Sequence, residues 1–183
     1  MKFTNRYQMT NRLFVGMVIL MISLISVGQV SAAALSDTDV TSLTWMREEE
    51  KLARDVYISL YKMWRLPVFD NISKSEQTHM DAILTLLNRY GIDDPASSDV
   101  GVFNNQTLQD LYDDLIAKGN NSIIEALEVG VDIEVLDIAD LAAEIAVTNL
   151  KDIKRVYTNL MNGSWNHYNA FVSNLAKRGV VYE

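Results

Sequence analysis

The feature that most constrains this chain is apolar spacing by three and four residues over four long stretches. They cover about residues 43–65, 72–90, 122–147 and 149–177. This spacing places side chains on one face of a helix, and no stretch alternates as a half-buried strand does. A shorter amphipathic stretch, 107–117, follows a long polar connection at 91–105. The pattern predicts an all-α protein, most simply an antiparallel four-helix bundle whose long crossover carries a short extra helix.

Several residues mark where these helices end or begin. Pro67 disfavours helix at the residue before it, and Gly91 provides a left-handed stop for the second long helix. Ser122 and Glu125 have the spacing of a capping box, and Thr148 is expected to cap the last helix. The helices therefore fall into two hairpins joined by the long crossover.

The first 32 residues have the layout of a secretory signal peptide. Lys2, Arg6 and Arg12 precede an apolar run at 13–28, and small residues follow at 30–34. An uncleaved membrane anchor is the alternative, but the run is shorter than the ~20 residues that usually span a bilayer. We therefore expect export to the periplasm or the extracellular space, without a stable membrane anchor. Residues 33–42 then read as a linker and 43–179 as the folded domain.

Composition excludes several kinds of site and partner. The chain has no cysteine, so it can form neither disulfides nor thiolate metal sites. Its formal net charge is −8. The only charged residues of the N-terminal segment are basic, so the part that remains after cleavage has a more negative net charge. Such a chain is not expected to bind nucleic acid.

Every long apolar stripe contains an acid or a histidine. These residues are Glu50 on the first, Glu76 and His79 on the second, Glu134 and Asp137 on the third, and His167 on the fourth. Buried carboxylates need partners, and most lysines and arginines fall outside the stripes. Two divalent cations would balance four carboxylates while the neutral imidazoles bind them, so the stripes predict a metal centre in the bundle core.

Other interpretations of these residues remain open at this point. Glu76 lies three residues after Ser73 and would also fit a helix cap, and His167 alone would fit a hydrogen-bonded core histidine. Glu134 and Asp137 alone would fit a solvated face. A second stripe through Glu49 is as apolar as the one through Glu50, so periodicity cannot choose between these two glutamates.

Two motifs resemble those of the ferritin-like superfamily. The run 50–57, EKLARDVY, resembles the first-helix motif E-x-x-A-R-x-x-Y of rubrerythrins, and the run 76–79, EQTH, resembles the second-helix E-x-x-H. The segments MREEEKLARDVY, SEQTHM, IEVLDIADL and GSWNHYNAF more closely resemble domain of unknown function 2202, an uncharacterised ferritin-like family. This resemblance covers about residues 43–176.

The resemblance implies metal ligands at Glu50, Glu76, His79, Glu134 and His167, and a tyrosine near the site at Tyr57. The chain departs from the usual fourth-helix E-x-x-H, because Ser164 stands where the glutamate is expected. Asp137 is a candidate to supply the missing oxygen.

The ligand types suit iron, with two ions expected and manganese or zinc as alternatives. An iron centre would reduce oxygen or peroxide with electrons from a separate donor, and Tyr57 would act as a hydrogen-bond donor or radical relay. Non-catalytic metal binding, or a metal that only stabilises a structural or interaction protein, are the alternatives. The sequence leaves the oligomeric state open.

Overall fold

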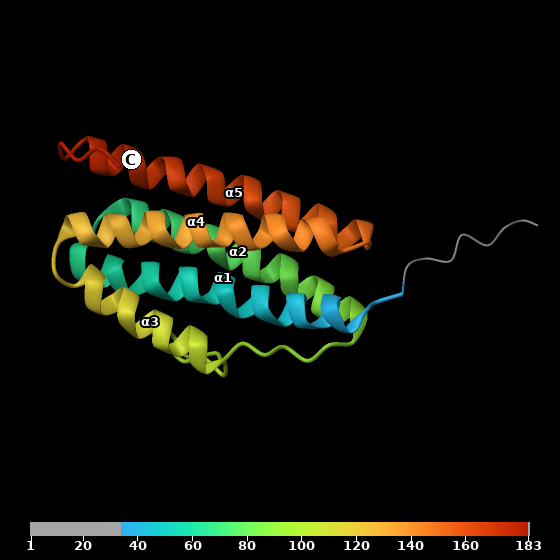
Figure 1. Ribbon diagram of the computed structural model, residues 1–183. Coiled ribbons are helices and arrows are strands. Elements are labelled where there is room, and N and C mark those ends of the chain that lie inside the picture. The colour runs from blue at the N-terminus through green and yellow to red at the C-terminus, as the bar shows by residue number, and fades with distance from the viewer. Residues whose placement is uncertain (1–33, 183) are drawn as a thin grey trace, which may run out of the picture. The chain divides into compact units, whose positions relative to one another are not determined.

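The computed structural model describes residues 34–182, which contain five helices and no strand (Figure 1). The expected all-α class is confirmed for this part of the chain. The signal peptide expected at 1–32 lies outside the described residues. Within residues 34–182, no helix is long and apolar enough to cross a membrane. The helices are α1 Asp37–Trp64, α2 Pro67–Tyr90, α3 Gln106–Gly119, α4 Ile123–Val147 and α5 Lys151–Ala176.

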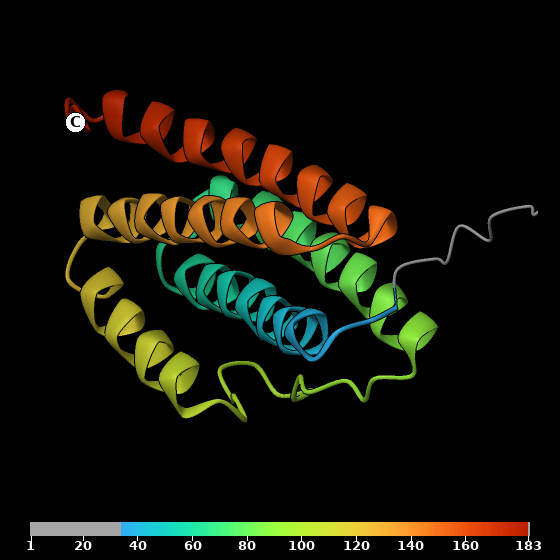
Figure 2. The same cartoon turned by 45° about the vertical axis from the view of Figure 1, so that its right-hand side comes forward.

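The four long helices form a closed ring of neighbours. α1 packs most extensively against α2, and α4 against α5, while α1 also contacts α4 and α2 contacts α5. Short connections join α1 to α2 and α4 to α5, so each of these pairs runs antiparallel (Figures 1 and 2). The short helix α3 lies outside this ring against α1 and α4.

Two helices begin earlier than the sequence pattern predicts. α1 begins at Asp37 rather than near Leu43, because Ser36 and Asp39 cap each other's backbone groups in a capping box. The linker expected at 33–42 is therefore helical over much of its length. α2 begins directly at Pro67, whose fixed φ suits the first helical position.

The start of α5 also differs from the expectation. Leu150, without a side-chain cap bond, occupies the N-cap position that we expected at Thr148. Thr148 instead ends α4, and its hydroxyl donates a 2.7 Å hydrogen bond to Asp39 Oδ1. Thr148 therefore links the end of α4 to the start of α1.

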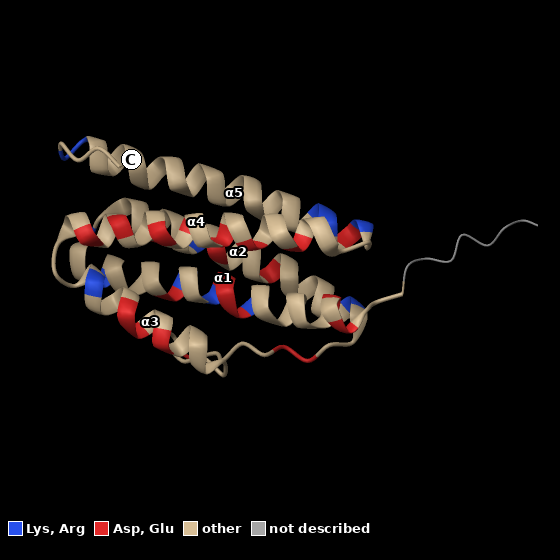
Figure 3. Ribbon diagram, in the orientation of Figure 1, with Lys and Arg blue, Asp and Glu red and all other residues tan. Residues whose placement is uncertain are grey.

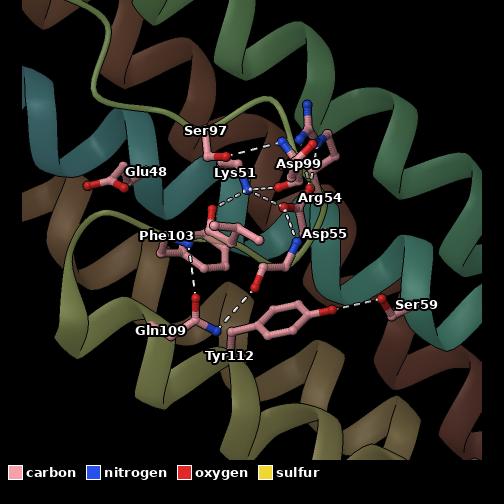
Figure 4. Close-up of polar contacts among 12 residues, drawn as sticks. Glu48, Lys51, Arg54, Asp55, Ser59, Ser97, Asp99, Phe103, Gln109 and Tyr112 are labelled. Atoms are coloured by element: carbon pink, nitrogen blue, oxygen red, sulfur yellow. Dashed lines mark hydrogen bonds and ion pairs between the residues drawn. The ribbon is translucent and has the colours of Figure 1, made fainter.

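The long crossover at 91–105 is fastened to α1 by buried charged side chains (Figure 4). Lys51 and Asp55 are fully buried and form an ion pair one helical turn apart. Lys51 Nζ also donates to the carbonyls of Asp99 and Val102, and Asp55 accepts from the Gly101 amide at 2.9 Å. These contacts satisfy backbone groups that an irregular segment would otherwise leave unpaired.

The apolar core is divided into two clusters. One contains Val56, Leu60 and Phe171, and the other contains Met46, Ile83 and Leu160. Along each long helix, the acids and histidines predicted from the stripes lie between the residues of these clusters. The fold therefore places a polar layer across an apolar interior.

Candidate metal centre

The structure brings together five of the predicted ligands, one or two from each long helix. Glu50 lies on α1, Glu76 and His79 on α2, Glu134 on α4 and His167 on α5, and none is more than 8% exposed. Glu134 and Asp137 are buried, so they do not form a solvated face. Glu76 lies well inside α2, so it does not cap that helix.

These five residues form two groups of three that share Glu76. The first is Glu50, Glu76 and His79, and the second is Glu76, Glu134 and His167. In each group one potential ligand atom per residue lies within 4.8 Å of the others. Glu76 Oε2 is 2.8 Å from His79 Nδ1, and Glu76 Oε1 is 2.7 Å from His167 Nδ1. The two carboxylate oxygens of Glu76 therefore face the two groups separately.

Several buried atoms of this layer lack hydrogen-bond partners among the described residues. Glu76 Oε1 and His167 Nδ1 are close, yet neither has a hydrogen bond of acceptable geometry. Glu50 Oε1 and Asp137 Oδ1 are also unpartnered. Buried polar atoms normally have a hydrogen-bond partner, and burying one without a partner costs free energy. Oxygen and imidazole nitrogen atoms left free in this way fit a divalent cation.

The outer nitrogen of each imidazole contacts a small residue. His167 Nε2 is 2.9 Å from Ser75 Oγ, which leaves Nδ1 to face Glu76 and Glu134. His79 Nε2 lies against Gly163, where an added Cβ would come within 2.6 Å of it. Such contacts fix ring orientation, as outer contacts of metal-binding histidines do.

Tyr57 lies beside the second group, as the resemblance implies. Its hydroxyl donates a 2.6 Å hydrogen bond to Glu134 Oε1 and lies 3.4 Å from the Gly130 carbonyl oxygen. Its ring packs against Phe69 and Phe171 in the apolar core. Tyr57 therefore orients Glu134 from a rigid position.

Asp137 lies at the edge of the centre, outside both groups. Ser164 donates a hydrogen bond to Asp137 Oδ2. Ser164 stands where the resemblance leads us to expect a glutamate ligand, and Asp137 is the candidate to replace that ligand. Glu49 is buried like Glu50, but only Glu50 belongs to a three-residue group. The structure thus separates two glutamates that periodicity could not.

The cluster is strongly coupled through its charges. Burial by itself raises the pKa of Glu76, but the close polar contacts with His167 and His79 and the charges of these imidazoles lower it to about 2. Burial by itself lowers the pKa of both imidazoles, yet the neighbouring carboxylates raise it to about 11 for His79 and about 9 for His167. Burial raises the pKa of Glu134 to about 8, helped by the charge of Glu76. Without cations, the centre therefore holds protons at neutral pH.

Sequence reasoning missed the small residues around the histidines. Ser75 and Gly163 lie next to residues of the apolar stripes and carry no spacing signal of their own. Only the packing of α2 against α5 brings them onto the imidazole rings. The proximity of Ser164 to His167 was visible, but its bond to Asp137 was not.

The fold and the site define a helical protein with a buried cluster of carboxylates and histidines. A family model described as "Uncharacterized protein domain (DUF2202)" matches residues 39–183, and the chain belongs to this family. The family assignment agrees with the four sequence segments that resemble it.

A relative and a solved structure extend the comparison. The chain is 52% identical over 149 residues to "Uncharacterized protein MJ0754" of Methanocaldococcus jannaschii, covering 81% of this chain and 80% of the relative. It is also similar to "Crystal structure of hypothetical protein MJ0754 from Methanococcus jannaschii DSM 2661", with a TM-score of 0.81 and 51% identity. That match covers 82% of this chain and 86% of the solved chain. Neither name assigns an activity.

Proposed function

We propose that this chain is a ferritin-like four-helix bundle that binds two metal ions, iron foremost, in the polar layer between its helices. Glu50, Glu76 and His79 would hold one ion, and Glu76, Glu134 and His167 the other. The observation that carries the proposal is the pair of three-residue groups sharing Glu76. Manganese and zinc accept the same ligands and are the alternatives.

Charge balance supports two ions rather than one. The three glutamates of the groups and Asp137 supply four negative charges in a buried layer, and two divalent cations neutralise them. The basic residues nearest Glu50 along α1 have other partners, since Lys51 and Arg54 pair with Asp55 and Arg47 pairs with Asp94. Most of the buried acids of the layer therefore depend on the histidines, on protons or on cations.

The chain's own residues would prepare the centre for redox chemistry. Bound iron would supply electrons and Lewis acidity for reduction of oxygen or peroxide. Tyr57 holds Glu134 in place through its hydroxyl proton, while Ser75 and Gly163 hold the two imidazoles. The low exposure of all five ligands restricts bulk water, which strengthens electrostatic interactions inside the layer. A separate donor would return these electrons to the iron.

Oxygen uptake by the iron-loaded protein tests this function. Metal-free protein is loaded with Fe(II) under anaerobic conditions and mixed with oxygenated buffer, with the Glu76→Gln variant as the matched control. We expect the iron-loaded protein to take up oxygen faster than the same amount of iron in buffer. The Glu76→Gln variant should lose this acceleration. Tight binding without uptake would leave the non-catalytic or metal-stabilised alternatives, and a very large particle mass would favour storage.

A further inference from the structure

A surface cavity lies between the first half of α1 and the last half of α4. Its volume is about 290 Å³, and its lining includes Trp45, Asp140 and Glu144 but no basic residue. Acidic residues recur along much of α4 (Figure 3). The electrostatic potential of a hollow with acidic walls concentrates cations.

Glu49 is a buried neighbour of two residues that line this cavity, Trp45 and Asp140. Its side chain is 3% exposed, and neither of its carboxylate oxygens has a hydrogen bond of acceptable geometry, although the side chains of Trp45 and Asp140 lie close to it. Burial raises its pKa, and the charges of Asp137 and Asp140 raise it further, while Trp45 is close enough to act in the opposite direction. Since Trp45 and Asp140 also line the cavity, the Glu49 carboxylate lies next to two of the lining residues.

Unpartnered carboxylate oxygens continue from Glu49 to the metal centre. Asp137 lies on α4, which packs against α1, and its charge raises the pKa of both Glu49 and Glu50 on that helix. Asp137 Oδ1 and Glu50 Oε1 are both unpartnered, and so is Glu144 Oε2 at the cavity. A series of acids therefore runs from the surface to the first three-residue group, with free oxygens at most of its members.

A ligand role in the centre does not account for Glu49 or for the cavity acids. Glu49 belongs to neither three-residue group, and Asp140 and Glu144 lie further along α4 than the predicted ligands. Burying a carboxylate without a partner costs several kcal/mol in typical proteins, and more when other acids are near. A passing cation with exchangeable water ligands would be stabilised by each of these oxygens in turn.

We propose that the cavity and Glu49 form the access path by which hydrated divalent cations reach the buried centre. Asp140 and Glu144 gather the cation, and Glu49 and Asp137 transfer it to Glu50 as carboxylate oxygens replace its waters. This inference rests on the proposed function, because it gives the centre its supply of metal. Oxygen ligands along the path suit Fe(II) and Mn(II).

The rate of metal uptake tests the path separately from the centre. Metal-free protein is mixed with Mn(II) alone in a stopped-flow instrument, and its intrinsic tryptophan fluorescence is followed. The double variant Asp140→Asn with Glu144→Gln removes the cavity charges, which are partly exposed, so the fold is expected to persist. The matched control is Glu128→Gln with Asp132→Asn, which changes the same residue types at the same spacing on α4.

We expect uptake to slow about tenfold or more in the cavity variant, as loss of electrostatic steering does, and less than twofold in the control. The uptake rate should also depend less on salt in the cavity variant. Glu49→Gln should slow uptake while equilibrium dialysis still gives two ions per chain. Unchanged rates in both variants, or loss of an ion in Glu49→Gln, would overturn the path. Wild-type protein that binds no ion would instead overturn the proposed function.

Discussion

Replacing Gly163 by alanine should displace His79 and weaken the binding of one of the two proposed ions. The added Cβ would lie 2.6 Å from His79 Nε2, whereas unstrained contacts are about 3.5 Å, so the ring must retreat by about 1 Å. Ligand distances in metal sites are held within about 0.2 Å. The affinity of the ion at Glu50, Glu76 and His79 should fall at least about tenfold, as it does when the orientation of a ligand is lost.

The metal-free protein should lose little stability from the same change. Overpacking costs about 1–3 kcal/mol, and replacing a helical glycine by alanine returns about 1 kcal/mol. The net loss is at most about 2 kcal/mol, a shift of Tm below about 8 °C for a domain of this size. A loss of this size leaves the variant folded, so reduced stability alone would not lower the affinity of the folded protein for the ion.

Calorimetric titration with Mn(II) and urea unfolding in chelator measure the two effects. Gly119→Ala is the control, since its Cβ would come equally close, 2.6 Å, to Leu60 Cδ2, the flexible end of a side chain outside the centre. The control should bind both ions normally. Normal affinity for both ions in folded Gly163→Ala would show that His79 is not a ligand held by this contact.

Three further predictions concern neighbouring features. Tyr57→Phe removes the hydrogen bond to Glu134, so we expect one Mn(II) affinity to fall about 10–100-fold in calorimetric titration; unchanged affinities would refute this positioning role. Asp55→Asn leaves the buried Lys51 without its charge partner, so urea unfolding should show a loss of about 3–5 kcal/mol, whereas Asp70→Asn, whose partner is exposed, should show no comparable loss. In the metal-free protein, Glu134 with pKa about 8 and the two histidines with pKa about 9 and 11 keep protons that the unfolded chain loses near 4.5 and 6.5. Its free energy of unfolding should therefore fall as pH rises from about 5 to 9, and a rise in chelator-treated samples would contradict this assignment.

The residues on the apolar stripes were predictable because helical spacing is a local property. Glu76 and His79 share a face at a spacing of three, and His167 and Glu134 follow the same rule on their own helices. A buried acid or histidine on each of four helices can meet only in the shared interior, so the sequence was sufficient to predict the cluster. The structure adds that Glu76 belongs to both groups.

Features that depend on packing between helices were not predictable. Periodicity could not separate Glu49 from Glu50, since both lie on buried stripes of α1 and only the position of α2 distinguishes them. The start of α1 was not predictable from the mostly polar residues 36–42. The Ser36 side chain accepts a hydrogen bond from the Asp39 amide at the helix end, and Thr148 at the end of α4 donates to the Asp39 carboxylate. The buried Lys51 was equally hidden, since its partners include carbonyls of the crossover.

Anomalous diffraction from crystals grown with Mn(II) tests the central claim most directly, because it locates each ion and counts the ions together. We predict two peaks per chain, one among Glu50, Glu76 and His79 and the other among Glu76, Glu134 and His167, with Glu76 contacting both. A single peak, or peaks only outside these residues, would contradict the two-ion centre.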